Sequence, residues 1–269
     1  MSYRKITGRN VNYYVMEPEA IFGATATIIE KEGKALLVDT QFSQDDAENI
    51  IRVAKENEIE IETIYISYSD PDYYFAANKI LEAFPNAKLI ATASNIERIQ
   101  STYEDKLVVW KDILKDKAPD KIIIPNEVRD LIKLDNEEFI IFGNDEKKQT
   151  LYNKLDELIL GGILISTDSH LFMADTKTVE SQKQWIDDLN ELISINPKTV
   201  IPGHFSKENE FSFENIKFTK EYIEKFMEVE KESKASNETI EKMKNIYPDL
   251  PDGSLEMSAK VVTGEMPWD

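Results

Sequence analysis

The first half of the chain alternates between short runs of β-forming residues and stretches with helical spacing. A turn at 31–34 lies between two such runs, which predicts a β-hairpin whose second strand ends at Asp39. Ser43 is the expected N-cap of the next helix, because Asp45 and Asp46 fall in its first turn. The pattern predicts strands at 24–29, 35–39, 61–67 and 87–91, and helices after Ser43, over 71–84 and from Ser94.

The second half is predicted to contain shorter strands and longer helices. Residues 103–125 have the weakest pattern and are expected to be helical in places. Trp185 and Leu189 lie at helical spacing on one side of a predicted helix, so both are expected in the core. Strands are predicted at 131–133, 138–142, 158–166 and 199–201, and helices at 180–195, 214–234 and 237–246.

Two β-rich halves that each carry helices predict two sheets packed face to face, with helices on both outer faces. The sequence contains no internal repeat, long linker or low-complexity segment. We therefore expect one domain over residues 1–269, with helices from about residue 214 at its C-terminal end. These acidic helices are expected to be solvated on one face. An amphipathic helix among them would also suit a seam between the subunits of a homo-oligomer.

Composition and charge narrow the functions that the chain can have. It has 269 residues, with 51 acidic and 32 basic side chains, and its net charge is −19. Such a charge leaves no basic face to neutralise phosphates, so nucleic acids and anionic membranes are not expected partners. A hydrophobic content of 41% excludes a disordered chain. The absence of cysteine excludes disulfides, thiolate metal ligands and a cysteine nucleophile.

The sequence signals of secretion and of membrane insertion are also missing. Polar residues follow Met1 where a secretory signal would have an apolar stretch. The longest apolar run, 158–165, contains two glycines and is too short to span a bilayer. A soluble cytoplasmic protein is therefore expected.

The segment that follows the strand at 61–67 carries a resemblance to a known family. Its residues Ser67-Tyr68-Ser69-Asp70-Pro71-Asp72-Tyr73 resemble the metal-binding loop of the metallo-β-lactamase superfamily, in which a strand ends in Thr-His-x-His-x-Asp-His. Val38-Asp39-Thr40 is similar to the family's hairpin strand that ends in aspartate, and Pro202-Gly203-His204 is similar to its terminal Pro-Gly-His. The resemblance runs through nearly the whole chain. It implies an α/β fold, the αββα sandwich of that superfamily, in which Asp39 supports the loop from behind.

Members of the family hold two metal ions with imidazoles and carboxylates, and most of these ligands are replaced in this chain. Aligned on the motif, the first histidine falls on Tyr68 and the second on Asp70, and the last histidine of the motif falls on Tyr73. Asp72 keeps the motif's aspartate. Tyrosine is a poor zinc ligand at neutral pH, because the pKa of its phenol is ~10.

The second half of the alignment loses two further ligands and keeps one. The histidine after the third strand falls on Asn144, or on Asp145 with a shift of one residue. The bridging aspartate falls on Gly162 or Gly161, and His204 keeps the final histidine. The resemblance therefore implies a fold that persists after ordinary two-zinc hydrolysis has been lost.

The resemblance also predicts which residues line the emptied site. His170 falls where this branch of the family has a pocket histidine, and Asp168 lies two residues before it. A buried core histidine is the alternative for His170. The predicted pocket comprises Tyr68, Asp70, Asp72, Tyr73, Asn144, Gly162, Asp168, His170 and His204.

The leading hypothesis is a pseudoenzyme without a cofactor that binds a small molecule or a protein partner. The rings of Tyr68 and Tyr73 are larger than the imidazoles they replace, so they are expected to fill the space of the cations. Their hydroxyls would then bond to Asp72 or His204 and satisfy buried polar groups. A protonated His204 would pair with Asp72 where a cation once neutralised it. Catalytic residues are not assigned.

A second hypothesis keeps a metal-dependent hydrolase of esters, lactones or related substrates. Its mononuclear site would consist of Asp70, Asp72 and His204, with Asp168 as a further candidate. Carboxylates with one imidazole would hold a single divalent cation, and Mn²⁺, Mg²⁺ or Ca²⁺ would suit them better than Zn²⁺.

A third hypothesis is hydrolysis without a metal. Ser67 or Ser69 would be the nucleophile, with His204 as its base and Asp72 orienting the imidazole. No nucleophile-elbow pattern surrounds either serine. A purely structural alternative makes Asp72 the cap of the helix that follows it.

Overall fold

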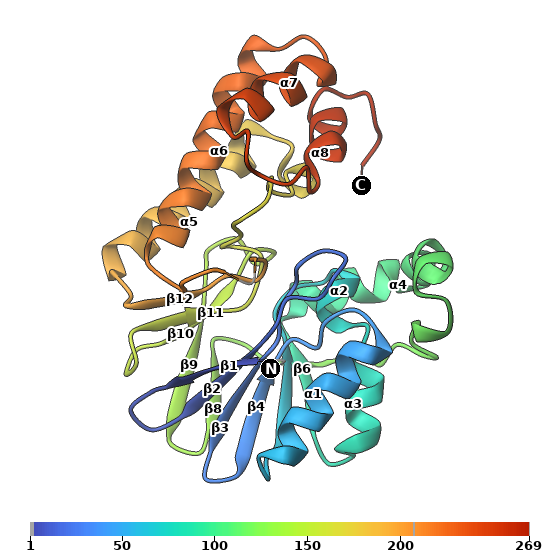
Figure 1. Ribbon diagram of the computed structural model, residues 1–269, viewed down its shortest axis with the longest axis vertical. Coiled ribbons are helices and arrows are strands. Elements are labelled where there is room, and N and C mark those ends of the chain that lie inside the picture. The colour runs from blue at the N-terminus through green and yellow to red at the C-terminus, as the bar shows by residue number, and fades with distance from the viewer. Residues whose placement is uncertain (1–2, 207, 269) are drawn as a thin grey trace.

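The computed structural model of this protein describes residues 3–206 and 208–268, and within them the chain forms two β-sheets that lie between helices (Figure 1). The larger sheet consists, in spatial order, of β1 (Tyr3–Thr7), β2 (Asn12–Met16), β3 (Thr27–Lys31), β4 (Lys34–Val38), β5 (Glu60–Ile66), β6 (Lys88–Ala91) and β7 (Asn126–Glu127). The smaller sheet consists of β12 (Thr199–Ile201), β11 (Leu158–Leu160), β10 (Thr150–Asn153), β9 (Glu137–Phe142) and β8 (Leu131–Leu134).

Helices cover the outer face of each sheet. In the described residues the α-helices are α1 (Gln44–Glu56), α2 (Pro71–Tyr74), α3 (Ala77–Ala83), α4 (Ala93–Leu114), α5 (Val179–Ile195), α6 (Glu214–Glu232), α7 (Ser236–Ile246) and α8 (Leu255–Val262). Short 3₁₀ helices lie at η1 (Lys115–Lys117) and η2 (Ala174–Thr176). Figure 1 shows α1, α3 and α4 beside the larger sheet, and α5 to α8 above the smaller one.

The central strands of the larger sheet are buried on both faces. Leu36 and Tyr65 pack into the core between the two sheets, whereas their neighbours Leu37 and Ile64 pack into the core beneath the helices. Successive side chains of a strand point to opposite faces, so an almost continuous apolar run serves both cores. A third core joins the smaller sheet to α5 and α6, and Trp185 lies inside it. These layers confirm the predicted αββα sandwich.

Local predictions that rest on a clear chemical signal are confirmed. The Ser43 hydroxyl accepts a hydrogen bond from the backbone of Asp46, and the Asp46 carboxylate accepts one from the Ser43 backbone, which completes a capping box. Trp185 is 1% exposed, and its indole nitrogen donates to the carbonyl of Leu164 at 2.8 Å.

Four regions differ from the sequence prediction. The helix predicted over 71–84 forms two helices, α2 and α3. The strand predicted over 158–166 ends at Leu160, because Gly161 and Gly162 have φ values of +76° and +69° that break the strand geometry. Residues 93–114 form one continuous helix. Its periodicity is blurred because Val108, Val109 and Ile113 lie exposed on its outer face. Strands β1, β2, β7 and β10 and helix α8 have no counterpart among the elements that the pattern predicts.

The two sheets bring their strand ends together at one edge. Strand β4 runs parallel to β5, and β11 runs parallel to β12, so each pair has its carboxyl ends on the same side. The amide of Gly162 after β11 donates to the hydroxyl of Ser67 after β5 at 2.7 Å, which joins the two ends. The residues of the predicted site leave the sheets at this edge. Among the described residues, no helix has the length and apolar character that a membrane crossing requires.

Candidate functional site

The loop after β5 enters α2 and directs two side chains at His204. Asp72 Oδ2 lies 2.9 Å from His204 Nε2, and the Tyr73 hydroxyl lies 3.1 Å from His204 Nδ1. The helix N-cap is Asp70 and not Asp72, so the structural alternative for Asp72 is wrong. Both ring nitrogens of His204 therefore have a partner, and the aspartate and histidine that the family motif retains form an ion pair.

The electrostatics of this group favour a charged imidazole. Burial alone lowers the pKa of His204, but the hydrogen bond and negative charge of Asp72 outweigh burial, and the pKa of His204 is raised. Burial, with the negative charge of Asp72, also raises the pKa of the Tyr73 phenol well above its ordinary value. A protonated His204 then donates to both neighbours, and the neutral Tyr73 hydroxyl faces the carbonyl of Gly162 at 3.5 Å.

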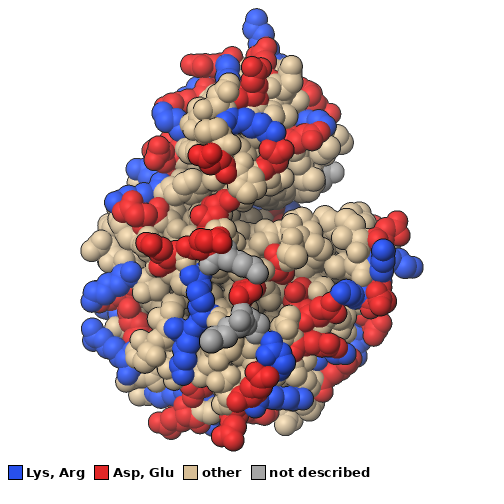
Figure 2. Space-filling model, viewed as in Figure 1, with Lys and Arg blue, Asp and Glu red and all other residues tan. Residues whose placement is uncertain are grey.

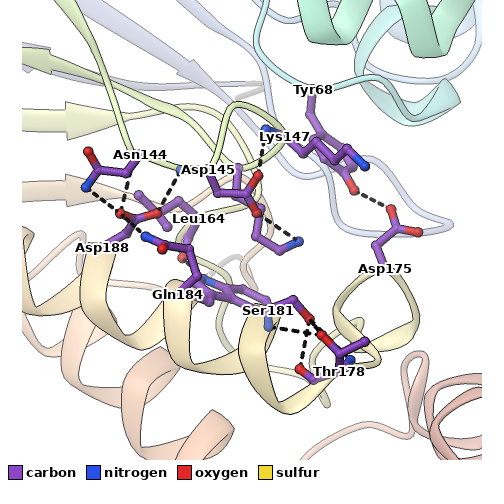
Figure 3. A network of polar contacts seen from close by, with 12 residues as sticks. Tyr68, Asn144, Asp145, Lys147, Leu164, Asp175, Thr178, Ser181, Gln184 and Asp188 are labelled. Atoms are coloured by element: carbon purple, nitrogen blue, oxygen red, sulfur yellow. Dashed lines mark hydrogen bonds and ion pairs between the residues drawn. The ribbon is translucent and has the colours of Figure 1, made fainter.

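Tyr68 points to a different partner. Its hydroxyl donates to Asp175 Oδ2 at 2.6 Å, as Figure 3 shows, and not to Asp72 or His204 as predicted. Asp175 also accepts from Arg98 Nη2 at 3.0 Å and from the Trp268 indole at 2.7 Å. Burial raises the pKa of Asp175, but the Arg98 charge and the two neutral donors outweigh it, and the pKa is lowered.

The Tyr68 and Tyr73 rings nevertheless pack together as expected for residues that fill a vacated space. Their centroids are 5.3 Å apart with an edge-to-face geometry, and the Tyr73 ring meets the His204 ring in the same way at 5.4 Å. Tyr68 is 2% exposed and Tyr73 is fully buried. Aromatic carbon therefore occupies the centre of the predicted pocket.

A second ion pair holds Asp70. Lys106 Nζ on α4 lies 2.6 Å from Asp70 Oδ1 and also donates to the carbonyl of Ser69 at 3.1 Å. Burial raises the pKa of Asp70, and the positive charge of Lys106 offsets only part of that effect. Lys106, Arg98 and Asp175 were missed by sequence reasoning, because nothing in a weak helical pattern or a short loop marks a residue that is paired across the fold.

Asp39 supports the loop from behind, as the resemblance implies. It accepts hydrogen bonds from the backbone and hydroxyl of Ser67 at 2.7 and 2.5 Å. Burial raises the pKa of Asp39 to about 7. The Ser67 hydroxyl thus donates to Asp39 and accepts from Gly162, so this fully buried serine is engaged in structure and is not presented as a nucleophile.

Three predicted pocket residues are engaged elsewhere. Asn144 donates to Asp188 at 2.9 Å on α5 (Figure 3), and Asp168 accepts from the Ser206 backbone at 2.8 Å. His170 Nδ1 lies 2.9 Å from the hydroxyl of Tyr222, within the helical core. The structure thus brings Tyr68, Asp72, Tyr73, Gly162 and His204 together, with Asp70 beside them.

The two glycines aligned with a bridging ligand have no room for a side chain. A Cβ at Gly162 would lie 1.8 Å from the Gln149 carbonyl oxygen, and a Cβ at Gly161 would lie 2.9 Å from the Val38 side chain. Both have positive φ, which a side chain would strain. The backbone at these two positions therefore fits glycine but no residue with a side chain.

These residues do not fit a metal ion. Its donors would have to be phenols whose pKa is raised, together with carboxylates already paired to Lys106 and His204. Across residues 3–206 and 208–268, no group of three or more His, Cys, Asp or Glu side chains is arranged to hold a metal ion. Cationic groups of the protein, on Lys106, Arg98 and His204, already pair with the carboxylates of this region.

Comparison with known proteins identifies the fold. No protein-family model and no curated protein matches the sequence. Among solved structures, the DIM-1 metallo-β-lactamase superposes with a TM-score of 0.59 at 17% identity, covering 84% of this chain and 98% of that chain. VMB-1 has a TM-score of 0.56 at 14% identity, covering 83% and 97%. TMB-1 has a TM-score of 0.56 at 18% identity, covering 84% and 98%. The chain has the metallo-β-lactamase fold.

Proposed function

We propose that this protein is a catalytically silent member of the metallo-β-lactamase fold that works by binding a small molecule or a protein partner. The observation that carries the proposal is the Asp72–His204–Tyr73 group. In it the two retained ligand residues hydrogen-bond to each other and to a tyrosine, with separations of 2.9 and 3.1 Å. A histidine held between a carboxylate and a phenol has no free ring nitrogen for a metal.

Charge balance supports this proposal. The edge where the sheets meet collects buried or partly buried carboxylates, and a buried charge is costly unless it is paired. In the metallo-enzymes of this fold, cations would neutralise such a cluster. Here Lys106 pairs with Asp70, Arg98 pairs with Asp175, and His204 pairs with Asp72. Side chains of the protein take over the neutralising role.

The absence of an activated nucleophile supports the loss of hydrolysis. Tyr68 and Tyr73 keep neutral phenols, because burial raises the pKa of both. Ser67 is committed to Asp39 and Gly162. The hydroxyls of Tyr68, Tyr73 and Ser67 are therefore all engaged in hydrogen bonds.

Metal content tests the proposal. The purified protein is incubated with zinc, manganese and calcium, desalted, and analysed by elemental mass spectrometry, together with the variants His204→Ala and His170→Ala. The expected result is retention far below one ion per chain in all three proteins. Near-stoichiometric retention that His204→Ala abolishes and His170→Ala preserves would overturn the proposal in favour of a mononuclear hydrolase. An ester, lactone and β-lactam hydrolysis screen of the same samples is expected to show no turnover above buffer.

A further inference from the structure

A buried lysine lies beside this site, and its amine has no hydrogen-bond acceptor among residues 3–206 and 208–268. Lys148 belongs to the loop between β9 and β10, and its side chain is 3% exposed. Its Nζ lies 4.0 Å from Asp145 Oδ2, beyond hydrogen-bonding distance, and 5.2 Å from the centroid of the Trp185 ring. The described contacts of Lys148 Nζ thus consist of one distant carboxylate and one aromatic face.

Lysines elsewhere near the site are held differently. Lys106 Nζ lies 2.6 Å from a carboxylate and also bonds to a carbonyl, as a buried ammonium requires. Lys148 has no comparable partner, and an ammonium in that position would be poorly compensated. A neutral amine avoids this cost, because it carries no charge to desolvate.

The charged groups around Lys148 fit a neutral amine. Burial lowers the pKa of Lys148, the negative charges of Asp145 and Asp175 raise it, and the positive charges of Arg98 and Lys147 lower it further; the net effect is a lowered pKa. An amine that is both desolvated and close to other cations is the usual form of a nucleophilic lysine.

Lys148 lies close to charged residues of the site. Figure 3 shows Asp145 and Lys147 on a loop that faces Tyr68 and Asp175 from the opposite side. Arg98 of α4 and Asp175 of η2 form an ion pair with each other. The charge of Asp175 raises the pKa of Lys148, and the charge of Arg98 lowers it. Figure 2 shows a cleft on this face of the molecule, between the region of α7 and α8 and the region of α2 and α4.

We propose that Lys148 is a nucleophilic amine site that takes aldehydes, with the carbonyl carbon bound to Nζ beside the Trp185 ring. The Nζ lone pair adds to the carbonyl carbon while the π electrons move to oxygen, and transfer of a proton from nitrogen to oxygen gives a carbinolamine. The hydroxyl then leaves as water while the nitrogen lone pair forms the C=N bond. The net change is amine plus aldehyde to imine plus water. Asp145, the nearest carboxylate, carries the proton between nitrogen and oxygen.

Reductive labelling tests this site directly. The intact protein is treated at pH 7 with acetaldehyde and sodium cyanoborohydride, which transfers hydride to the imine carbon and fixes each imine as an N-ethyl group. Peptide mass spectrometry then gives the initial rate of labelling at each lysine. Lys148 is expected to react about tenfold faster than Lys147, because a larger fraction of its amine carries no proton.

Lys147 is a matched internal control, because it is the adjacent residue in the same loop and its side chain is exposed. In urea-unfolded protein the two lysines are expected to react at similar rates, since the environment of Lys148 is lost. Lys147→Arg should leave the fast site intact, and Lys148→Arg should remove it, with thermal unfolding of both variants as a check of folding. Labelling of Lys148 at the same rate as Lys147, or more slowly, in the folded wild-type protein would overturn the proposal.

This inference goes beyond the proposed function, because the labelling reports on Lys148 alone. The labelling is repeated after treatment with a metal chelator, so that the amine site and the metal-free site are tested separately. A protein that retains zinc and still labels rapidly at Lys148 would refute the metal-free site and support the amine site. A metal-free protein without rapid labelling at Lys148 would support the metal-free site and refute the amine site.

Discussion

His204 is the residue on which the arrangement of the site depends most. The aspartate and histidine of the family motif remain in place, and each has become the other's partner at 2.9 Å. Sequence reasoning predicted this pair, because the resemblance aligns Asp72 and His204 with two residues that converge at the site of the family fold. It also predicted the Tyr73 contact, which spans 3.1 Å. The contact of Tyr68 was predicted wrongly. Its hydroxyl bonds to Asp175, which lies more than one hundred residues away in the sequence, and no sequence pattern links the two segments.

The Asp72–His204 pair makes a pH-dependent contribution to stability. The pKa of His204 is raised above its ordinary value of 6.5 in the folded protein, so the pair's contribution is fully present below pH 6.5 and is lost as the pH rises through the folded-state pKa. Asp72→Asn is expected to lower the free energy of unfolding by about 1–3 kcal/mol at pH 6. This loss should shrink toward pH 9.

Urea unfolding from pH 6 to pH 9 measures this effect. The exposed Asp187 provides the control, because Asp187→Asn removes a carboxylate away from the site. A destabilisation by Asp72→Asn that stays constant or grows with pH would show that His204 is not charged in the folded protein.

Gly162 sets a steric limit on any attempt to restore a metal ligand. Its Cβ would meet the Gln149 carbonyl at 1.8 Å, and its φ is +69°. Gly162→Ala is expected to lower the free energy of unfolding by more than about 2 kcal/mol. Gly264→Ala is the matched control, because Gly264 has a φ of +76° but nothing within 4 Å.

The control isolates the steric clash from backbone strain. Gly264→Ala should cost only about 1 kcal/mol from the positive φ. Both variants are compared by chemical denaturation at pH 7. Equal losses would mean that the backbone around Gly162 has more room than the structure gives it.

At the scale of the element, helix α4 has the largest influence on the site. Arg98 and Lys106 lie eight residues apart on it and therefore on the same face, where they neutralise Asp175 and Asp70. The sequence predicted a helix from Ser94 but only helical pieces beyond residue 103. Exposed apolar residues on the outer face of α4 obscured its helical periodicity beyond residue 103. The face that carries both cations could therefore not be recognised.

Removal of one of these cations is expected to destabilise the fold. Lys106→Met leaves Asp70 partly buried with no counter-ion and should lower the free energy of unfolding by about 1–3 kcal/mol. Lys111→Met, an exposed change on the same helix, should stay within about 0.5 kcal/mol of the wild type. Thermal and urea unfolding at pH 7 provide the measurement. Equal effects of the two substitutions would show that the Lys106–Asp70 pair adds no stability.

The clearest strands followed the sequence about as closely as the long helices α5, α6 and α7 did. Clear β-forming runs located β3 to β6 within a few residues, because strands buried on both faces need almost unbroken apolar sequence. Strand β11 was predicted too long, since the chain stays apolar after Leu160 and only the backbone angles of two glycines end the strand. Strands β1 and β2 were missed.

At the scale of the whole molecule, the sequence predicted the layers but not the pairing between distant segments. Two β-rich halves with helices suggested a sandwich, and the resemblance of the motif segments placed them at one edge. Which side chains pair at that edge depends on how distant segments pack against each other in the folded chain. Asp175, Arg98 and Lys106 come from segments with no shared sequence signal, and only the folded chain brings them together.

The net charge of −19 also acts on the whole molecule. Acidic side chains cover much of the face seen in Figure 2, with fewer basic ones between them. Repulsion among them opposes the compact state, and salt screens it over about 10 Å at 0.1 M. The melting temperature is therefore expected to rise from 10 to 200 mM NaCl, by roughly 2–4 °C for each kcal/mol of repulsion removed.

Differential scanning calorimetry at several salt concentrations checks this effect. Replacing NaCl with KCl at equal ionic strength should give the same curve, because screening depends on ionic strength and not on a specific ion. A melting temperature that falls with salt would indicate that exposed ion pairs outweigh the general repulsion.

The state of the His204 ring tests the central claim most directly, since the chain contains two histidines and their nitrogen signals can be separated. In a ¹⁵N spectrum at pH 6, His204 is expected to carry protons on both ring nitrogens, because its pKa is raised above 6.5, and one equivalent of Zn²⁺ should leave its signals unchanged. Burial lowers the pKa of His170, so its ring should lose its proton at a lower pH than the ring of His204 and serve as an internal reference. A neutral His204 with a bare nitrogen that shifts when zinc is added would contradict the side-chain network and restore a metal site.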